Sequence, residues 1–194
     1  MTIRPPREME IAAGAGLMTT SRFEAEHASE DAQLVSRAAQ GDEVAFSSLY
    51  QRYARMVHGL LLARVGPADA DDLVQDVFLT AWRRLEDLRD SAAFGGWLAA
   101  IARNRATDHL RRRPRLEELP GHLMASDATA ARVEALAVLA LIRTLPEAYR
   151  ETLVLRLVEG LTGPEIAERT GLTPASVRVN LHRGMKMLRE KLQG

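Results

Sequence analysis

The stretch FGGWLAAIARNRATDHLRRR, residues 94–113, divides into an apolar half and an arginine-rich half. Its first half places apolar side chains at helical spacing, which predicts one face docked on a core: Phe94, Trp97, Leu98 and Ile101. Its second half carries five arginines around Asn104, Thr107 and Asp108. One helix is therefore expected to be anchored at one end and cationic at the other. A cationic end suits a phosphate backbone, but it is equally typical of a solvated amphipathic helix.

The composition is that of an ordinary soluble globular protein, with 46% hydrophobic and 27% charged residues among 194. Few aromatic residues and no sustained alternation of apolar and polar positions predict an all-α fold of one large or two small domains. Cysteine is absent from the sequence, which excludes disulfides and thiolate metal sites. No apolar run approaches the ~20 residues that span a bilayer, and no secretory signal is recognisable, so a cytoplasmic location is expected.

The formal net charge of zero hides a segregation of charge along the chain. Residues 64–90 hold four arginines and seven acidic residues, whereas residues 91–113 hold five arginines and one aspartate. Residues 169–194 hold six basic residues and one glutamate. Two basic segments separated from an acidic one predict two contacts with one polyanion, and an acidic face for another partner.

Proline, glycine and the loss of periodicity divide the chain into four segments. Residues 1–30 are expected to be a flexible tail, in which Met18 is an alternative start. Residues 31–113 are expected to form a first helical domain. Residues 114–126 contain two prolines and a glycine and predict a flexible linker, and residues 127–194 are expected to form a second helical domain.

Capping residues predict where individual helices begin. Ser91 is expected to cap the helix that starts near Phe94, and Asp127 a helix of the second domain. Asp42 is expected to cap a long helix that ends at Gly66-Pro67. The inward positions predicted for that long helix are Val44, Phe46, Leu49, Tyr50, Tyr53, Val57, Leu60 and Leu61.

A helix over about residues 68–85 shows an apolar stripe and an opposite polar face that carries Asp72, Gln75, Asp76 and Leu79. A leucine beside carboxylates suggests a protein contact, although single exposed leucines are common. Asp71, Asp72 and Asp76 also resemble the carboxylate clusters that hold Mg²⁺ in all-helical prenyl-transfer enzymes. No second Asp-rich helix is available to face them. The five histidines never pair at metal-ligand spacing, so surface positions, no metal and no cofactor are expected.

The C-terminal segment predicts a helix-turn-helix. Thr162-Gly-Pro-Glu165 matches a capping box, the short helix that follows ends at Gly171, and Thr173-Pro174 opens a longer basic helix. The inward positions of this last helix are expected to be Val177, Leu181, Leu188 and Leu192.

Early residues of the second helix in such a motif reach base edges, whereas flanking basic side chains hold phosphates. The residues predicted to read bases are Ser176, Val179, Asn180 and Arg183. Arg178 and Lys186 are predicted to contact the phosphate backbone. The alternative is that these side chains are simply the solvated face of the helix.

Four collinear stretches together resemble the extracytoplasmic-function (ECF) sigma factors, the two-domain initiation factors of bacterial RNA polymerase. The stretches are AQGDEVAFSSLYQRY (39–53), ADADDLVQDVFLTAWRRL (68–85), the opening stretch (94–113) and the helix-turn-helix segment (145–192). The resemblance covers roughly residues 33–192. It implies binding rather than catalysis, so no catalytic residue is expected, and it implies core RNA polymerase, promoter DNA and an inhibitory anti-sigma factor as partners.

The resemblance also implies roles for matching positions. The face with Asp72, Gln75, Asp76 and Leu79 matches the surface that binds the β′ clamp of the polymerase, and a contact with the β flap is implied as well. The loop Leu85–Ser91 matches the segment that captures a flipped base of the minus-10 element. The residues implied to contact the melted minus-10 strand are Leu88, Arg103, Asn104, Thr107, Asp108, Arg111 and Arg112.

The second domain is implied to read the minus-35 element as duplex, through Thr173 and the six residues of the last helix named above. Leu88 stands where relatives often carry an aromatic residue, and Val179 and Asn180 stand where they often carry Ser and Arg. The promoter sequence therefore cannot be transferred from a relative. The main alternative is a stand-alone helix-turn-helix regulator, which would bind duplex DNA tightly without polymerase.

Overall fold

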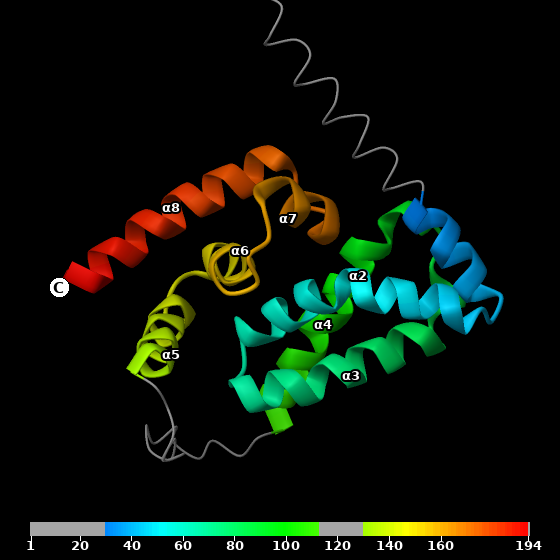
Figure 1. Ribbon diagram of the computed structural model, residues 1–194, viewed down its shortest axis with the longest axis horizontal. Coiled ribbons are helices and arrows are strands. Elements are labelled where there is room, and N and C mark those ends of the chain that lie inside the picture. Colours follow the sequence, from blue (N-terminus) through cyan, green and yellow to red (C-terminus); the bar gives the residue numbers. More distant parts are fainter. Residues whose placement is uncertain (1–29, 113–129, 194) are drawn as a thin grey trace, which may run out of the picture.

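The computed structural model describes residues 30–112 and 130–193, and within these ranges every regular element is a helix (Figure 1). The all-α prediction is confirmed. A helical stretch over residues 30–39 comes first. It is followed by α2 (Glu43–Leu62), α3 (Pro67–Arg83), α4 (Phe94–Arg112), α5 (Ala130–Arg143), α6 (Glu147–Leu157), α7 (Gly163–Thr170) and α8 (Pro174–Gln193), with short 3-10 turns at Leu85–Asp87 and Ser91–Ala93.

The N-terminal bundle consists of residues 30–39, α2, α3 and α4. Asp42 caps α2 as predicted, because its carboxylate accepts hydrogen bonds from the backbone N–H groups of Val44 and Ala45. Gly41 precedes it with φ of +90°, a conformation that favours glycine and ends the first helical stretch. The buried Asp31 of that stretch forms an ion pair with Arg52 on α2, so the two helices are joined by charge as well as by apolar contact.

The apolar half of α4 is anchored in this bundle, as the sequence predicts. Phe94, Leu98 and Ile101 are buried, and Trp97 packs partly buried against the same core. The ring of Phe94 meets that of Tyr53 edge to face, with centroids 5.1 Å apart. This anchoring fixes the direction in which the arginine-rich half of α4 leaves the core.

The C-terminal bundle consists of α5 to α8, and α7 with α8 forms the predicted helix-turn-helix. Thr162 and Glu165 make a complete capping box at the start of α7, with the Thr162 N–H donating to Glu165 Oε2 at 2.7 Å. This backbone donor is the main cause that lowers the pKa of Glu165. Gly171 ends α7 in the left-handed region at φ of +73°, which turns the chain into α8.

Replacing Thr162 by Ala is expected to lower the free energy of unfolding by about 1 kcal/mol, because the start of α7 loses its cap. Thermal or urea unfolding of the full chain measures this change. Ser36→Ala is the matched control: its hydroxyl donates to the Ala32 carbonyl within a helix and caps no terminus, so a change below about 0.5 kcal/mol is expected. Equal effects of the two substitutions would contradict the assigned cap.

Several predictions about individual residues were wrong. Ser91 does not cap α4: it starts a 3-10 turn that Asp90 caps by accepting from the Ala92 N–H, and α4 begins only at Phe94. Gly66-Pro67 opens α3 rather than ending α2, which stops at Leu62. Three positions expected inside lie largely outside the core: Val44, Tyr50 and Leu192 are 73%, 43% and 56% exposed.

Two histidines expected at the surface, His58 and His109, are partly buried and lie near carboxylates. The predicted tail up to residue 29, the linker 114–126 and the Asp127 cap lie outside the described residues.

The two bundles contact each other directly, which the sequence did not predict. Helix α6 packs on α2, and α7 packs on both α2 and α4 (Figure 1). Arg143 extends across the boundary from α5 and donates to the backbone carbonyls of Leu62, the last residue of α2, and of Val65 in the turn that follows. These contacts place the helix-turn-helix beside α4.

Candidate functional site

A polar cleft of about 480 Å³ lies between α3 and α4 and gathers much of the predicted minus-10 set. Four of the seven predicted residues line it: Asn104, Thr107, Asp108 and Arg111. The other lining residues are Thr80, Arg84, Ile101 and Arg105. The cleft therefore combines three guanidinium groups and one carboxylate with amide and hydroxyl groups and one apolar side chain. Its excess of positive charge suits a phosphate together with a base.

The hydrogen bonds of the cleft show which cations are held and which are exposed. Arg105 donates to the Thr80 hydroxyl at 2.6 Å and is thereby fixed in place. Arg84 and Arg111 are 58% and 78% exposed, and each pairs with an aspartate on its own segment, at 3.2 Å and 3.7 Å. Exposed ion pairs of this kind contribute little stability and exchange easily for other anions. The rim of the cleft is thus open to a polyanion.

Three predicted minus-10 residues lie outside this cleft. Leu88 is partly buried against the apolar core. Arg112 lines a smaller cavity of about 100 Å³ together with Asp76 and His109. Arg103 is directed away from the cleft and donates to Glu151 of α6, with Nη2 3.0 Å from Oε2.

Arg84, Arg105 and Thr80 were missed as cleft residues by reasoning from the sequence. Arg105 belongs to the basic half of α4, but the spacing alone did not show which arginines turn toward α3. Thr80 lies on α3 and Arg84 caps its C-terminal end, whereas the polar face predicted from the sequence for this helix was the acidic one. The spacing of these two residues did indicate a shared face, because residues 80 and 84 are one helical turn apart at the C-terminal end of α3.

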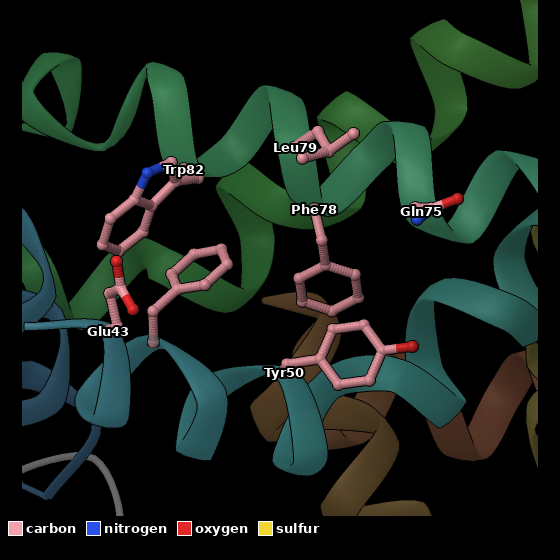
Figure 2. A pocket seen from close by; sticks show the side chains of 7 residues that line it. Glu43, Tyr50, Gln75, Phe78, Leu79 and Trp82 are labelled. Carbon is pink, nitrogen blue, oxygen red and sulfur yellow. The ribbon is translucent and has the colours of Figure 1, made fainter.

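An apolar groove of about 340 Å³ runs along the shared edge of α2 and α3 (Figure 2). It is lined by Glu43, Phe46, Tyr50, Gln75, Phe78, Leu79 and Trp82. Figure 2 shows the ring of Tyr50 on α2 facing that of Phe78 on α3, and their centroids are 4.5 Å apart. Phe46 lies between Phe78 and Trp82, with centroid distances of 6.3 Å and 4.7 Å. These ring contacts give the groove a firm aromatic floor.

Two of the four predicted polymerase-binding residues, Gln75 and Leu79, line this groove. Leu79 is 46% exposed, which confirms that it lies off the core stripe of α3. Asp72 is exposed on the same helix, and Asp76 borders the cavity shared with α4. The contribution of α2 to this surface was not predicted from the sequence, because Phe46 and Tyr50 were expected to be core residues.

The predicted base-reading helix α8 has its early residues at the surface. Ser176, Val179 and Arg183 are exposed, and Asn180 is half-buried. The flanking Arg178 and Lys186 are exposed too.

Thr173 acts as a helix cap, since its hydroxyl oxygen accepts from the Ser176 N–H at 3.1 Å, and the two hydroxyl oxygens lie 2.8 Å apart. Thr173 and Ser176 are therefore hydrogen-bonded to each other at the start of α8. The side chains of Val179, Asn180 and Arg183 are not part of this cap.

Two other features, a metal site and a membrane-spanning helix, are not found in the described part of the chain. Among residues 30–112 and 130–193, no group of three or more His, Asp or Glu residues could hold a metal ion. The same residues contain no helix long and apolar enough to cross a membrane.

Comparisons with known proteins agree with the division into two bundles. A family model described as Sigma-70 region 2 matches residues 49–116, and one described as Sigma-70, region 4 matches residues 135–188. The chain is 34% identical to the ECF RNA polymerase sigma-E factor of Haemophilus influenzae over 181 residues, 84% of this chain and 95% of that relative. Identity to the sigma-E factor of Escherichia coli (strain K12) is 32% over 185 residues, 84% and 94% of the two chains.

A solved structure of CnrH in complex with the cytosolic domain of CnrY is also similar. The match has a TM-score of 0.60 at 29% sequence identity, and it covers 84% of this chain and 97% of that chain.

Proposed function

This chain belongs to the ECF sigma factors of bacterial RNA polymerase, and on that premise we propose that the α3–α4 cleft holds the melted minus-10 strand. The convergence of Asn104, Thr107 and Arg111 with Arg84 and Arg105 in one cleft is the observation that supports this proposal. The amide of Asn104 can hydrogen-bond a base edge, and the arginines can hold its phosphates. Leu88, Arg103, Asp108 and Arg112 complete the proposed minus-10 surface.

The apolar groove between α2 and α3 is the proposed polymerase-binding surface. An apolar floor with Leu79 at its edge favours an amphipathic partner helix, such as those of the β′ clamp. The exposed Asp72 and the nearby Asp76 add negative charge that would steer a cationic partner toward the groove. A second contact, between the C-terminal bundle and the β flap, is proposed from family membership.

Helix α8 is proposed to read the minus-35 duplex. Its exposed Val179 and Arg183, with Asn180 between them, would enter the major groove, while Arg178 and Lys186 contact phosphates. Thr173 and Ser176 are proposed to position the start of the helix at the DNA backbone. The proposed domain boundaries are 31–113 and 127–194, with residues 114–126 as the linker.

The proposed mechanism is binding without catalysis by the sigma factor. The polymerase supplies phosphoryl transfer, while this chain selects the promoter and captures extruded bases. Flipping a base costs a few kcal/mol, which trapping that base in the α3–α4 cleft can offset. Two tethered domains strengthen weak contacts through their effective concentration. Such a factor acts in the cytoplasm with the polymerase, and an anti-sigma factor is a proposed partner, since CnrH forms a complex with CnrY.

Run-off transcription with core polymerase tests the proposal. Promoter-specific transcripts are expected only when both core polymerase and this chain are present. The chain alone should bind promoter duplex poorly in a gel-shift assay. Tight and specific duplex binding by the chain alone, with no transcripts, would instead establish the alternative of a stand-alone helix-turn-helix regulator.

A further inference from the structure

We propose that the contact between the two bundles is an intramolecular latch. In this latch the carboxylate of Glu151 forms an ion pair with the guanidinium of Arg103, which is then not available to a DNA phosphate. The inference rests on the proposed function, because it takes Arg103 as part of the minus-10 surface. Glu151 lies on α6 and is only 6% exposed. Its Oε2 is 3.0 Å from Arg103 Nη2, and its Oε1 is 2.8 Å from Arg64 Nη2. One carboxylate of the C-terminal bundle therefore neutralises two arginines of the N-terminal bundle.

The energetic consequence follows from burial. A buried ion pair contributes little by itself, because desolvation of both charges opposes their attraction. Removing the carboxylate, however, takes from Arg103 the ion pair that it makes in the closed arrangement, and leaves Arg64 paired with Glu147 only. The closed arrangement then loses stability relative to an open one, in which water solvates both arginines. Glu151 thus helps to hold the two bundles together, whereas each bundle keeps its own core.

Two glycines show that the backbone itself is shaped for this closed arrangement. A Cβ at Gly95, in the first turn of α4, would lie 2.4 Å from the backbone carbonyl oxygen of Arg169 on α7. A Cβ at Gly59, inside α2, would lie 2.7 Å from Leu155 Cδ2 on α6. Glycine inside a helix costs roughly 0.5–1 kcal/mol relative to alanine. Both glycines lie where the C-terminal bundle makes its closest approach.

The closed arrangement cannot serve both promoter elements at once. Elements centred near positions minus-10 and minus-35 are about 25 base pairs apart, roughly 85 Å of duplex at 3.4 Å per base pair. A compact chain of this length is only roughly 40 Å across. Because α8 lies in the bundle that packs on α4, the two bundles must separate before both elements are bound. The latch therefore opposes promoter binding by the free chain.

A second ionic contact makes the latch sensitive to pH. His58 on α2 has Nδ1 2.6 Å from Glu159 Oε1 and Nε2 3.3 Å from Asp71 Oδ1, and Arg55 Nε lies 4.0 Å from Glu159 Oε2. The hydrogen bond with Glu159 raises the pKa of His58 above its ordinary value of 6.5, against the opposing effect of burial. Opening removes Glu159, so the proton is bound more tightly in the closed state than in the open one.

The closed state is therefore expected to lose stability as the pH rises. The contribution of His58 is complete below its ordinary pKa and disappears as the pH passes through the raised pKa. The closed fraction of the wild-type chain should therefore fall as the pH rises above about 6.5 and passes through the raised pKa of His58. His58→Gln should flatten this dependence, and an unchanged pH profile in that variant would remove His58 from the latch.

The distance between the bundles can be measured in the full chain, which contains no cysteine and so accepts a unique pair of labels. Gln51 on α2 and Arg189 on α8 are both exposed. The substitutions Gln51→Cys and Arg189→Cys therefore provide the two attachment points for the fluorophores. Gly95→Ala and Glu151→Gln are each expected to raise the ratio of open to closed molecules about tenfold or more. Energy transfer should fall accordingly.

Two matched controls accompany these variants. A Cβ at Gly96 would lie 3.7 Å from its nearest neighbour, an ordinary contact, so Gly96→Ala should stay closed. Glu134→Gln removes a charge from an exposed position of α5 and should stay closed too. Circular dichroism establishes that every variant is folded. Wild-type energy transfer in folded Glu151→Gln and Gly95→Ala would overturn the latch.

Binding to a single-stranded oligonucleotide at low salt tests the role of Arg103. Glu151→Gln is expected to bind about tenfold more tightly than wild type, and adding Arg103→Ala should abolish that gain. No gain in Glu151→Gln would overturn the proposed occupation of Arg103 by Glu151. Failure of the proposed function can be distinguished from failure of the latch. If the proposed function is wrong, the wild-type chain supports no run-off transcription, whatever distances between the bundles are measured.

Discussion

Leu79→Arg is expected to weaken binding to core RNA polymerase by about 100-fold, a loss of the size caused by replacing a residue that contributes strongly to an interface. Leu79 borders the apolar groove between α2 and α3 and is 46% exposed, so its side chain is available to a partner. A guanidinium at this position would have to be desolvated against the aromatic floor. Its positive charge would also oppose any cationic partner attracted by Asp72 and Asp76.

The fold should tolerate this change. Arginine and leucine have similar helix propensities, and the position lies outside the core. The free energy of unfolding is therefore expected to change by less than about 0.5 kcal/mol. Binding of labelled protein to core polymerase, measured by fluorescence anisotropy, gives the affinity.

Leu110→Arg provides the matched control for this prediction. Leu110 on α4 is 47% exposed and lies outside the groove, so its replacement tests whether any exposed arginine in the N-terminal bundle weakens binding. Wild-type affinity is expected for Leu110→Arg. Equal losses for both variants, or no loss for Leu79→Arg, would refute the groove as the polymerase-binding surface.

Asn104→Ala is expected to slow open-complex formation on a duplex promoter by about tenfold or more, since one specific base contact contributes about 1–3 kcal/mol. Asn104 is exposed on α4 at the cleft, where its amide can both donate to and accept from a base. Alanine is a better helix former than asparagine, so α4 should gain rather than lose stability. A fall in activity therefore cannot be caused by unfolding.

The choice of template identifies which step depends on Asn104. On a promoter whose minus-10 region is already mismatched, the cost of flipping the base is lower, and the defect should shrink. Asn104→Asp keeps the size of the side chain but adds a negative charge facing phosphates, and it should be at least as defective as Asn104→Ala. Wild-type rates for both variants on the duplex template would exclude Asn104 from base capture.

Local features of the fold could be predicted because their causes lie within a few residues. The Asp42 cap, the Thr162–Glu165 capping box and the left-handed Gly171 all follow from side chains that bond the backbone three residues away or from a single φ angle. The exposure of Leu79 followed from helical periodicity alone. Helix boundaries were predicted less well where two neighbouring residues could both act as caps. At Ser91 the preceding Asp90 caps the 3-10 turn instead.

The candidate site was predicted only in part, because spacing along one helix does not show which neighbour it faces. Phe46 and Tyr50 were assigned to the core from their spacing on α2. The packing of α3 leaves them on a shared edge, where they form the groove. Arg105 turns to Thr80 of α3 while Arg103 turns to α6, although both belong to the same basic run.

An all-α chain, a helix-turn-helix near the C-terminus and a helix with one apolar and one cationic half could all be inferred from residue order. Each of these depends on periodicity and capping, which are local. The burial of Glu151 between Arg64 and Arg103 could not be inferred in this way, because in the sequence it is an ordinary helical glutamate. The same is true of Gly95, which makes room for the carbonyl of Arg169. Both contacts join residues far apart in the chain, and their partners are set by how two separately folded bundles pack together.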